Sequence, residues 1–308
     1  MIEGNTKGAD RMNTFRTELV NLLNEKLGDG YIVRPVDVTK NNGVMYSGIT
    51  ICENGCNIAP TIYINEWFDK FEKGDVDYEV VVNKIIDIYN ANKTNSNFEV
   101  QKILDFDKVR DHILLNVVNK ERNYESFYMN DICYCNVPCV KDLAIVFYIE
   151  LSFGGCNASV TIKSDFLNKW GIDISELLRI AFDNLEKQEY FIENIIDFLP
   201  IHDDIPDVGM FVCSNKKKYF GASAIMRKDV LKRAAGVLGG DFYIIPSSVH
   251  ELLFIKMDDS VLDDVSAHIL EIIANVNENE VDEDEILSDN LYIYRHKNES
   301  IEVKFADF

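Results

Sequence analysis

A short segment in the last third of the chain carries the residue types of a hydrolytic site. Directly after Pro246 come Ser247, Ser248, His250 and Glu251. A serine, a histidine and a carboxylate are the groups that nucleophilic catalysis uses. Adjacent strand residues point to opposite faces, however, and triad members normally converge from separate segments. Three interpretations stay open: a serine-capped turn with a histidine bonded to backbone, a binding site, and a catalytic serine.

The binding interpretation includes Asp241, because the candidate segment is 239–251, in which Pro246-Ser247-Ser248 forms a turn between two apolar strands. Gly239 and Gly240 follow a predicted helix instead of opening one, so they indicate a helix C-cap and not a phosphate-binding loop. No dinucleotide fingerprint, paired-histidine zinc helix or nucleophile elbow occurs elsewhere in the sequence. We therefore expect no cofactor and assign no catalytic residue.

Cysteine spacing suggests a metal site only weakly. Cys133, Cys135 and Cys139 lie close together, but structural zinc sites use four ligands, usually in two well-spaced pairs. No nearby histidine completes the set, and Cys52 and Cys56 would complete it only by packing against the three. The chain has 7 cysteines, an odd number spread over 308 residues, which is not the pattern of a secreted disulfide scaffold. We expect reduced structural thiols and no metal.

The charge of the chain is strongly one-sided. Its 52 acidic residues against 31 basic ones give a net charge of −21, a field that repels nucleic-acid phosphates. The compact basic run is 216–218, and the acidic run 275–289 lacks the central glycine of a calcium loop, so it predicts a solvated helix end. The acidity serves solubility, or forms a surface that meets a basic protein or mimics nucleic acid.

The elements that would position these residues follow an α+β order. Apolar spacing predicts a helix over 13–27 that Gly28 ends. Strands over 31–38 and 44–51 form a hairpin, since Asn-Gly tolerates the positive φ of its turn. A helix over 78–89 completes this first module.

Similar patterns continue along the chain. We predict strands over 143–151 and 158–162 with helices over 165–170 and 175–185, and then strands over 210–213, 219–226, 242–245, 251–255, 292–295 and 301–305 with helices over 230–238 and 262–276. The run Gly55-Cys56-Asn57 recurs at 155–157, which is consistent with a duplication. The predicted organisation is a flexible N-terminus (1–11) and three consecutive small modules of mostly antiparallel sheet with packed helices: 12–95, 100–200 and 207–308.

Four blocks of sequence resemble a known bacterial family. They are 40–43, Asn57–Tyr63, Asp142–Ala144 and, most specifically, 239–251, which ends in Pro-Ser-Ser-Val-His-Glu. The chain resembles the family catalogued as domain of unknown function 5688 from about Met12 to Tyr294. The resemblance implies one full-length unit and adds no mechanism, because the family has no established activity.

The functional expectation rests on these exclusions. No stretch approaches the roughly 20 apolar residues of a membrane span, and the first residues lack the apolar centre of a signal peptide. We expect a cytoplasmic, non-enzymatic binding or adaptor protein whose partner is another protein, with no membrane or nucleic-acid partner. The alternative is a hydrolase or small-molecule-binding protein that uses the Ser247–Glu251 turn, and a third option is an acidic nucleic-acid mimic.

Overall fold

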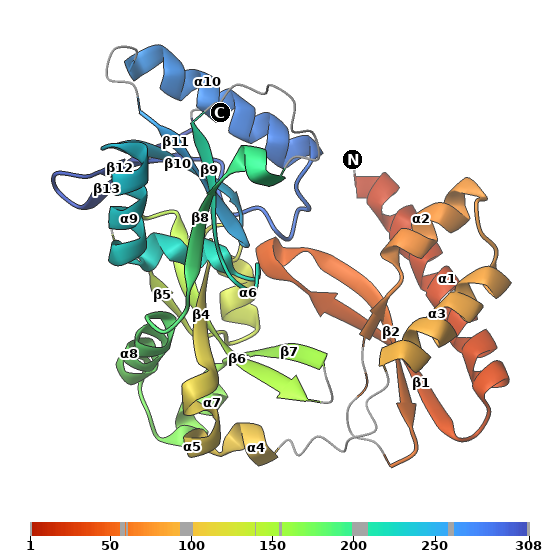
Figure 1. The fold of residues 1–308 in the computed structure, drawn as a ribbon. Coiled ribbons are helices and arrows are strands. Elements are labelled where there is room, and N and C mark those ends of the chain that lie inside the picture. The colour runs from red at the N-terminus through yellow and green to blue at the C-terminus, as the bar shows by residue number, and fades with distance from the viewer. Residues whose placement is uncertain are drawn as a thin grey trace. The chain divides into compact units, whose positions relative to one another are not determined.

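The computed structural model describes residues 2–55, 59, 61–92, 101–138, 140–153, 156–198, 209–257 and 262–306. The chain divides into two compact units (Figure 1). The first contains residues 1–40, 44–101 and 152–157, and the second contains 41–43, 102–151 and 158–308. The chain therefore enters the second unit at 41–43 and returns to the first before it leaves the hairpin.

The first unit is a three-stranded antiparallel sheet covered by helices. Its elements are α1 (Ile2–Leu27), β1 (Tyr31–Thr39), β2 (Met45–Glu53), β3 (Thr61–Tyr63), α2 (Asn65–Lys73) and α3 (Tyr78–Asn92). The strand order is β1-β2-β3, and Thr39 pairs with Met45 at the end of the predicted hairpin, which is confirmed. Phe15 and Leu19 of α1 are buried against Ile49 and Ile62 of the sheet, so the apolar stripe found in the sequence packs on one sheet face.

The second unit contains two sheets. The four-stranded sheet has the order β4-β6-β5, with β7 also paired to β6. Its strands and flanking helices are α4 (Gln101–Leu104), α5 (Phe106–Val109), β4 (Ile113–Asn119), α6 (Tyr124–Met129), β5 (Tyr134–Asn136), β6 (Leu143–Phe153), β7 (Cys156–Thr161), α7 (Ser164–Trp170) and α8 (Ile174–Leu185). Every residue of β4 is buried, which explains its continuous apolar sequence.

The six-stranded sheet of this unit has the order β13-β12-β10-β11-β9-β8. Its elements are β8 (Tyr190–Asn194), β9 (Met210–Asn215), α9 (Lys228–Leu238), β10 (Phe242–Ser248), β11 (Glu251–Lys256), α10 (Leu262–Asn279), β12 (Leu291–Arg295) and β13 (Ser300–Lys304). Tyr243 and Ile293 face α10, and alternate residues such as Phe242 and Tyr294 form the opposite face, where their ring centroids lie 5.1 Å apart. Helices therefore cover both faces, as Figure 1 shows for α9 and α10.

Two segments differ from the sequence expectations. In the range 1–11, predicted as a flexible N-terminus, α1 begins at Ile2, and the flexibility of this range stays a prediction. The strand predicted over 219–226 is wrong: 3-10 helix η4 occupies Gly221–Met226. Phe220 has a left-handed φ of 57°, and a Cβ on Gly221 would lie 2.4 Å from the His250 carbonyl oxygen. Backbone packing, which apolar alternation does not encode, sets this turn.

The α+β class is confirmed, with antiparallel sheets and packed helices in each unit. The division into modules 12–95, 100–200 and 207–308 stays a prediction. Strand β8, from the expected second module, pairs with β9 of the expected third. Within the described part of the chain, no helix combines the length and the apolar character that crossing a bilayer requires.

Candidate functional site

At the turn between β10 and β11, polar side chains form hydrogen bonds with backbone groups. The Ser248 hydroxyl oxygen accepts a hydrogen bond from the His250 amide at 3.0 Å. The Ser214 hydroxyl donates to the His250 carbonyl at 2.7 Å, and the Val249 amide donates to the Glu285 carbonyl at 2.9 Å. Ser247 is half-buried beside them. These contacts are those of a capped structural turn.

The His250 imidazole is occupied on both sides. Its Nδ1 accepts from the Phe220 amide at 3.0 Å, and its Nε2 lies 3.4 Å from a carboxylate oxygen of Glu285. The ring stacks on Phe220 with centroids 5.6 Å apart and planes 10° apart, and Tyr219 also stacks on it at 5.3 Å. Because the Phe220 amide uses the Nδ1 lone pair, a neutral imidazole carries its proton on Nε2 and faces Glu285. Among the described residues, no serine hydroxyl forms a hydrogen bond with this ring.

The two other predicted residues lie apart from the imidazole contacts. Asp241 accepts from the His296 amide at 2.7 Å and from the Arg295 guanidinium at 3.1 Å. Glu251 begins β11, opposite Ser248 in the strand register. The structure thus brings Ser248, His250 and Glu251 to one turn and places Asp241 before the other end of β10. A binding role for them stays a prediction.

Of the cysteine candidates, Cys133 is a buried thiol and Cys135 is a half-buried one. Burial raises the pKa of Cys133 to about 11 and also raises the pKa of the half-buried Cys135. A raised pKa keeps sulfur as the thiol, whereas metal binding requires the thiolate. Cys139 lies outside the described residues. Among the residues that are described, no group of three or more histidine, cysteine and acidic side chains is placed to hold a metal ion.

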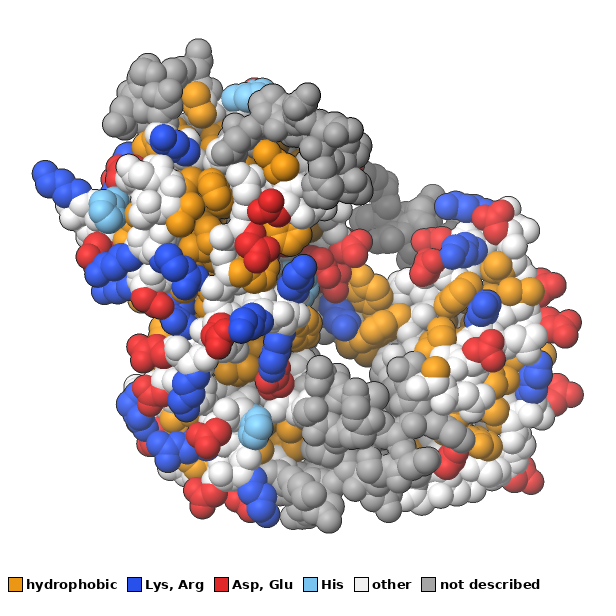
Figure 2. Space-filling model, in the orientation of Figure 1, with side chains coloured by type: hydrophobic (Ala, Val, Ile, Leu, Met, Phe, Trp, Pro, Cys, Tyr) orange, Lys and Arg blue, Asp and Glu red, His pale blue; other side chains and the backbone are white. Residues whose placement is uncertain are grey.

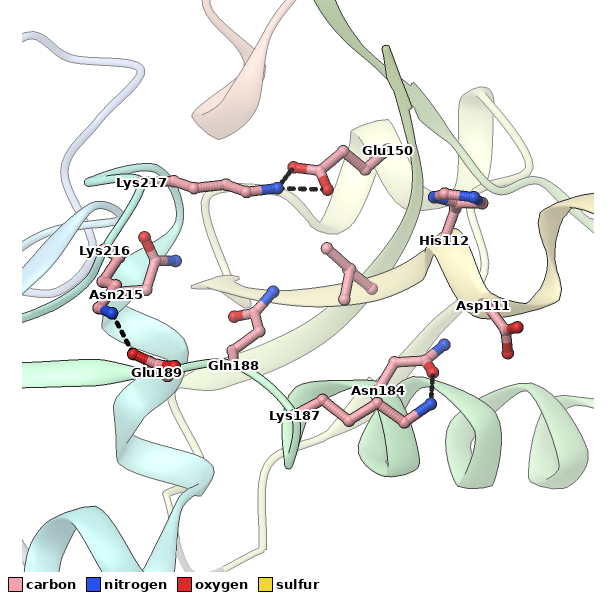
Figure 3. A pocket seen from close by; sticks show the side chains of 11 residues that line it. Asp111, His112, Glu150, Asn184, Lys187, Gln188, Glu189, Asn215, Lys216 and Lys217 are labelled. Carbon is pink, nitrogen blue, oxygen red and sulfur yellow. Dashed lines mark hydrogen bonds and ion pairs between the residues drawn. The ribbon is translucent and has the colours of Figure 1, made fainter.

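A cavity of about 310 Å³ lies in the second unit (Figure 3). Side chains from several separate segments line it: Asp111, His112, Leu114, Glu150, Asn184, Lys187, Gln188, Glu189, Asn215, Lys216 and Lys217. Lys217 pairs with Glu150, with N–O distances of 2.5 and 2.6 Å, and Lys216 pairs with Glu189. Two lysines of the basic run, Lys216 and Lys217, thus line a pocket, and their charges are balanced by carboxylates.

Helix α6 presents a group of exposed large side chains, which we call the α6 patch: Tyr124, Tyr128 and Met129 of α6 and Tyr134 of β5. Their exposed fractions are 63%, 86%, 80% and 38%, respectively. Phe127, on the inner side of the helix, is buried and stacks on Tyr134 with centroids 4.5 Å apart. One buried ring therefore anchors the patch to the sheet beneath.

A buried asparagine fixes the start of α6. Asn123 donates through its side-chain amide to the side-chain oxygens of Asn41 and Asn42 at 2.9 and 3.0 Å, and its own oxygen accepts from the Asn42 amide at 2.9 Å. Asn42 in turn donates to the carbonyls of Glu283 and Ile286 at 2.8 and 2.7 Å. Asn42 has the positive φ, 59°, that the Asn-Gly signal predicts. Backbone carbonyls of the acidic run 275–289 therefore accept hydrogen bonds from the turn that contains Asn42.

The sequence contains a signal for the α6 patch that apolar periodicity alone does not reveal. Four large side chains within the six residues Tyr124–Met129 cannot all face one core, so some must meet solvent or a partner. The pocket had no such signal, because its lining residues come from distant segments whose meeting depends on the tertiary fold.

Comparison with known proteins gives one match. The model of a family described as "Family of unknown function (DUF5688)" matches residues 12–296, which confirms the resemblance drawn from the four sequence blocks. No curated protein and no solved structure matches the chain.

Proposed function

We propose, for a chain that belongs to DUF5688, a family of unknown function, that it is a non-enzymatic cytoplasmic module which binds another protein through the α6 patch. The observation that carries the proposal is the exposure of Tyr128 and Met129, at 86% and 80%. Tyrosine and methionine are enriched at the centres of protein interfaces, and clustered exposed apolar side chains mark interaction sites.

The patch is held in place before any partner arrives. Phe127 packs in a cluster with Val118 and Ala144. Asn123, the residue that precedes the helix, is held by hydrogen bonds to the Asn41 side chain and the Asn119 carbonyl. A rigid surface loses less conformational entropy on binding, so more of its contact energy appears as affinity. Met129 adds an adaptable side chain to the rigid aromatic ones.

The partner we propose is a protein with a positively charged surface. The net charge of −21 attracts such a surface over the distance of a Debye length and speeds its encounter with the chain. On the face drawn in Figure 2, lysine and arginine side chains alternate with carboxylates over the second unit. That mixture favours protein contact over nucleic-acid mimicry, which needs acids gathered on one surface.

The alternative that uses the Ser247–Glu251 turn receives less support. A catalytic histidine requires a free nitrogen directed at the nucleophile, and the Phe220 amide uses Nδ1 of His250. Nε2 faces Glu285 at 3.4 Å. These contacts favour a structural role for the turn.

The test compares two baits that differ only in the patch. Proteins retained from bacterial cytoplasm by the parent chain are compared with those retained by Tyr128→Ser/Met129→Ser, and each candidate is then purified and titrated. We expect the genuine partner to be lost with the double variant, its Kd to rise at least about tenfold, and binding to weaken with salt.

A matched control is Val237→Ser, which removes an exposed apolar side chain (53%) from α9, away from the patch. It should retain the partner with an unchanged Kd. Equal retention by parent and patch variant, with equal affinities for every purified candidate, would contradict the proposal.

A further inference from the structure

The pocket of the second unit leaves one charge of each sign for a ligand. Of its charged side chains, Lys217 and Lys216 are neutralised by the carboxylates of Glu150 and Glu189. Lys187 instead donates to the side-chain oxygen of Asn184 at 2.9 Å and forms no ion pair among the described residues. Asp111 is exposed and has no ion pair there either. In Figure 3 the Lys217–Glu150 pair borders the upper edge of the pocket, and Lys187 and Asp111 lie below it.

The walls of the pocket are fixed by buried amides. Asn184, 5% exposed, donates to the carbonyls of Arg110 and Ile113 at 2.8 and 2.9 Å and so ties the end of α8 to the start of β4. Asn215, also 5% exposed, bonds to the carbonyl of Tyr219 at 2.7 Å and to its amide at 3.3 Å, which closes the loop that carries the lysines. The backbone that carries the charged groups is therefore fixed by the fold.

The apolar lining and the volume of the pocket restrict the class of ligand that it can bind. Leu114, which belongs to the buried strand β4, supplies an aliphatic side chain to the lining. A cavity of about 310 Å³ is near the lower end of the range of ligand pockets, about 300–1,000 Å³. It suits a molecule of a few heavy atoms better than a nucleotide.

We propose that this pocket binds a free α-amino acid with an apolar side chain. The ligand carboxylate meets the Lys187 ammonium, its ammonium meets the Asp111 carboxylate, and its side chain contacts Leu114. The two ion pairs at the edge add no net charge to the pocket, so they do not favour a ligand of large net charge. The proposal is independent of protein binding at the α6 patch.

The first experiment titrates the full chain with L-leucine and with two analogues that each lack one charge, 4-methylpentanoate and 3-methylbutylamine. Saturation-transfer NMR and calorimetry supply the affinities, after a screen of leucine, isoleucine, valine, methionine and phenylalanine. At least one of the five amino acids should bind, and analogues that lack either charge should bind about tenfold more weakly.

The second experiment assigns each charge to its residue. Lys187→Gln should weaken leucine binding about tenfold and leave the affinity for 3-methylbutylamine unchanged, because that analogue has no carboxylate to lose. Asp111→Asn should weaken leucine binding and leave 4-methylpentanoate unchanged. The controls Lys169→Gln and Asp165→Asn make the same charge changes in an exposed pair of α7 and should bind leucine as the parent does.

Several results would overturn the proposal. One is the absence of binding of all five amino acids at 10 mM (about the weakest useful affinity for a small ligand). Another is an analogue that binds as tightly as the amino acid, which would make the pocket a site for a single charge. Unchanged leucine affinity in either pocket variant would also overturn it. If Lys187→Gln melts at a lower temperature, the exposed Asp111→Asn variant decides the question.

Discussion

His250 is the single residue whose replacement tests the turn most directly. Its Nδ1 accepts from the Phe220 amide, and truncation leaves that amide without its partner. We expect His250→Ala to lower the free energy of unfolding by about 1–3 kcal/mol, and Ser248→Ala to lower it by about 0.5–1.5 kcal/mol through the lost bond to the His250 amide. Urea denaturation of each variant measures both values.

Ser247 is the matched control for this series. It is half-buried in the same turn, but the hydroxyl contact belongs to Ser248. Ser247→Ala should change stability by no more than about 0.5 kcal/mol. If all three variants denature like the parent, the turn is not structural, and its polar side chains become the first candidates for ligand binding.

Because two thiols are buried, we expect the folded chain to lose stability at alkaline pH. Burial raises the pKa of Cys133 to about 11 and that of Cys213 to about 12. The unfolded chain releases these protons from about pH 8.5, while the folded chain keeps them. The stability contribution is therefore complete below about pH 8.5 and declines as pH rises toward 11.

Urea midpoints at pH 8 and at about pH 9 test this prediction below the range where tyrosines ionise, about pH 10. The midpoint should fall over this interval, and it should fall less in Cys213→Ala, which removes one of the two titrations. If the urea midpoint of the parent chain is the same at both pH values, the thiols have the same pKa in the folded and unfolded states, which contradicts the prediction.

At the scale of elements, η4 depends on a glycine that no other residue replaces. A Cβ on Gly221 would lie 2.1 Å from the Ser214 hydroxyl, 2.4 Å from the His250 carbonyl and 2.8 Å from the Asn215 amide. Two of these neighbours are backbone and cannot move alone. Gly221→Ala should therefore destabilise the chain by about 1–3 kcal/mol or more, measured by thermal or urea denaturation.

Gly236 supplies the contrast. It lies inside α9, and a Cβ there would meet nothing within 4 Å. Gly236→Ala should stabilise the chain by up to about 1 kcal/mol, because alanine is the better helix former. Equal effects of the two substitutions would mean that packing at Gly221 does not control η4.

Elements with a single apolar face were predictable from the sequence, and elements shaped by contacts were not. Periodicity located α3, α8 and α9 to within a few residues, because each buries one stripe. The Asn-Gly signal located the hairpin of β1 and β2. The alternation of apolar residues in 219–226 predicted a strand. Phe220 and Gly221 instead form a turn whose conformation depends on contacts with Ser214 and His250.

The candidate sites follow the same rule. The turn Ser247–Glu251 was located correctly because its residues are contiguous, but the partners of His250, Phe220 and Glu285, are 30 and 35 residues away. The distribution of charge within the pocket depends on which lysine meets which carboxylate. The sequence shows the basic run 216–218. The tertiary fold determines that Lys216 and Lys217 pair with carboxylates, whereas Lys187 bonds to the Asn184 side-chain oxygen.

At the scale of the whole molecule, charge and local pairing both oppose binding to DNA. Lys216 and Lys217 pair with carboxylates, and Lys218 lies over the Phe198 ring at 5.2 Å from its centroid. Around these residues the field of a chain with net charge −21 repels phosphates. We expect no complex with duplex DNA at micromolar protein and about 150 mM salt.

Fluorescence anisotropy with a labelled duplex measures this directly. Glu150→Gln/Glu189→Gln, which frees Lys216 and Lys217, is the informative comparison and should show the stronger residual binding at low salt. A salt-sensitive complex formed by the parent chain and lost in Lys216→Gln/Lys217→Gln would establish a real basic surface and contradict the prediction.

The bonds of Asn42 to Glu283 and Ile286 have a consequence for synthesis. Asn42 and Ile286 are 244 residues apart in the sequence, and a ribosome adds about 5–20 residues per second. The Asn42 side-chain amide therefore waits on the order of 10–50 s for these two acceptors, until the acidic segment emerges. Translation speed between Asn42 and Ile286 thus determines how long the Asn42 amide stays accessible to chaperones and to incorrect partners.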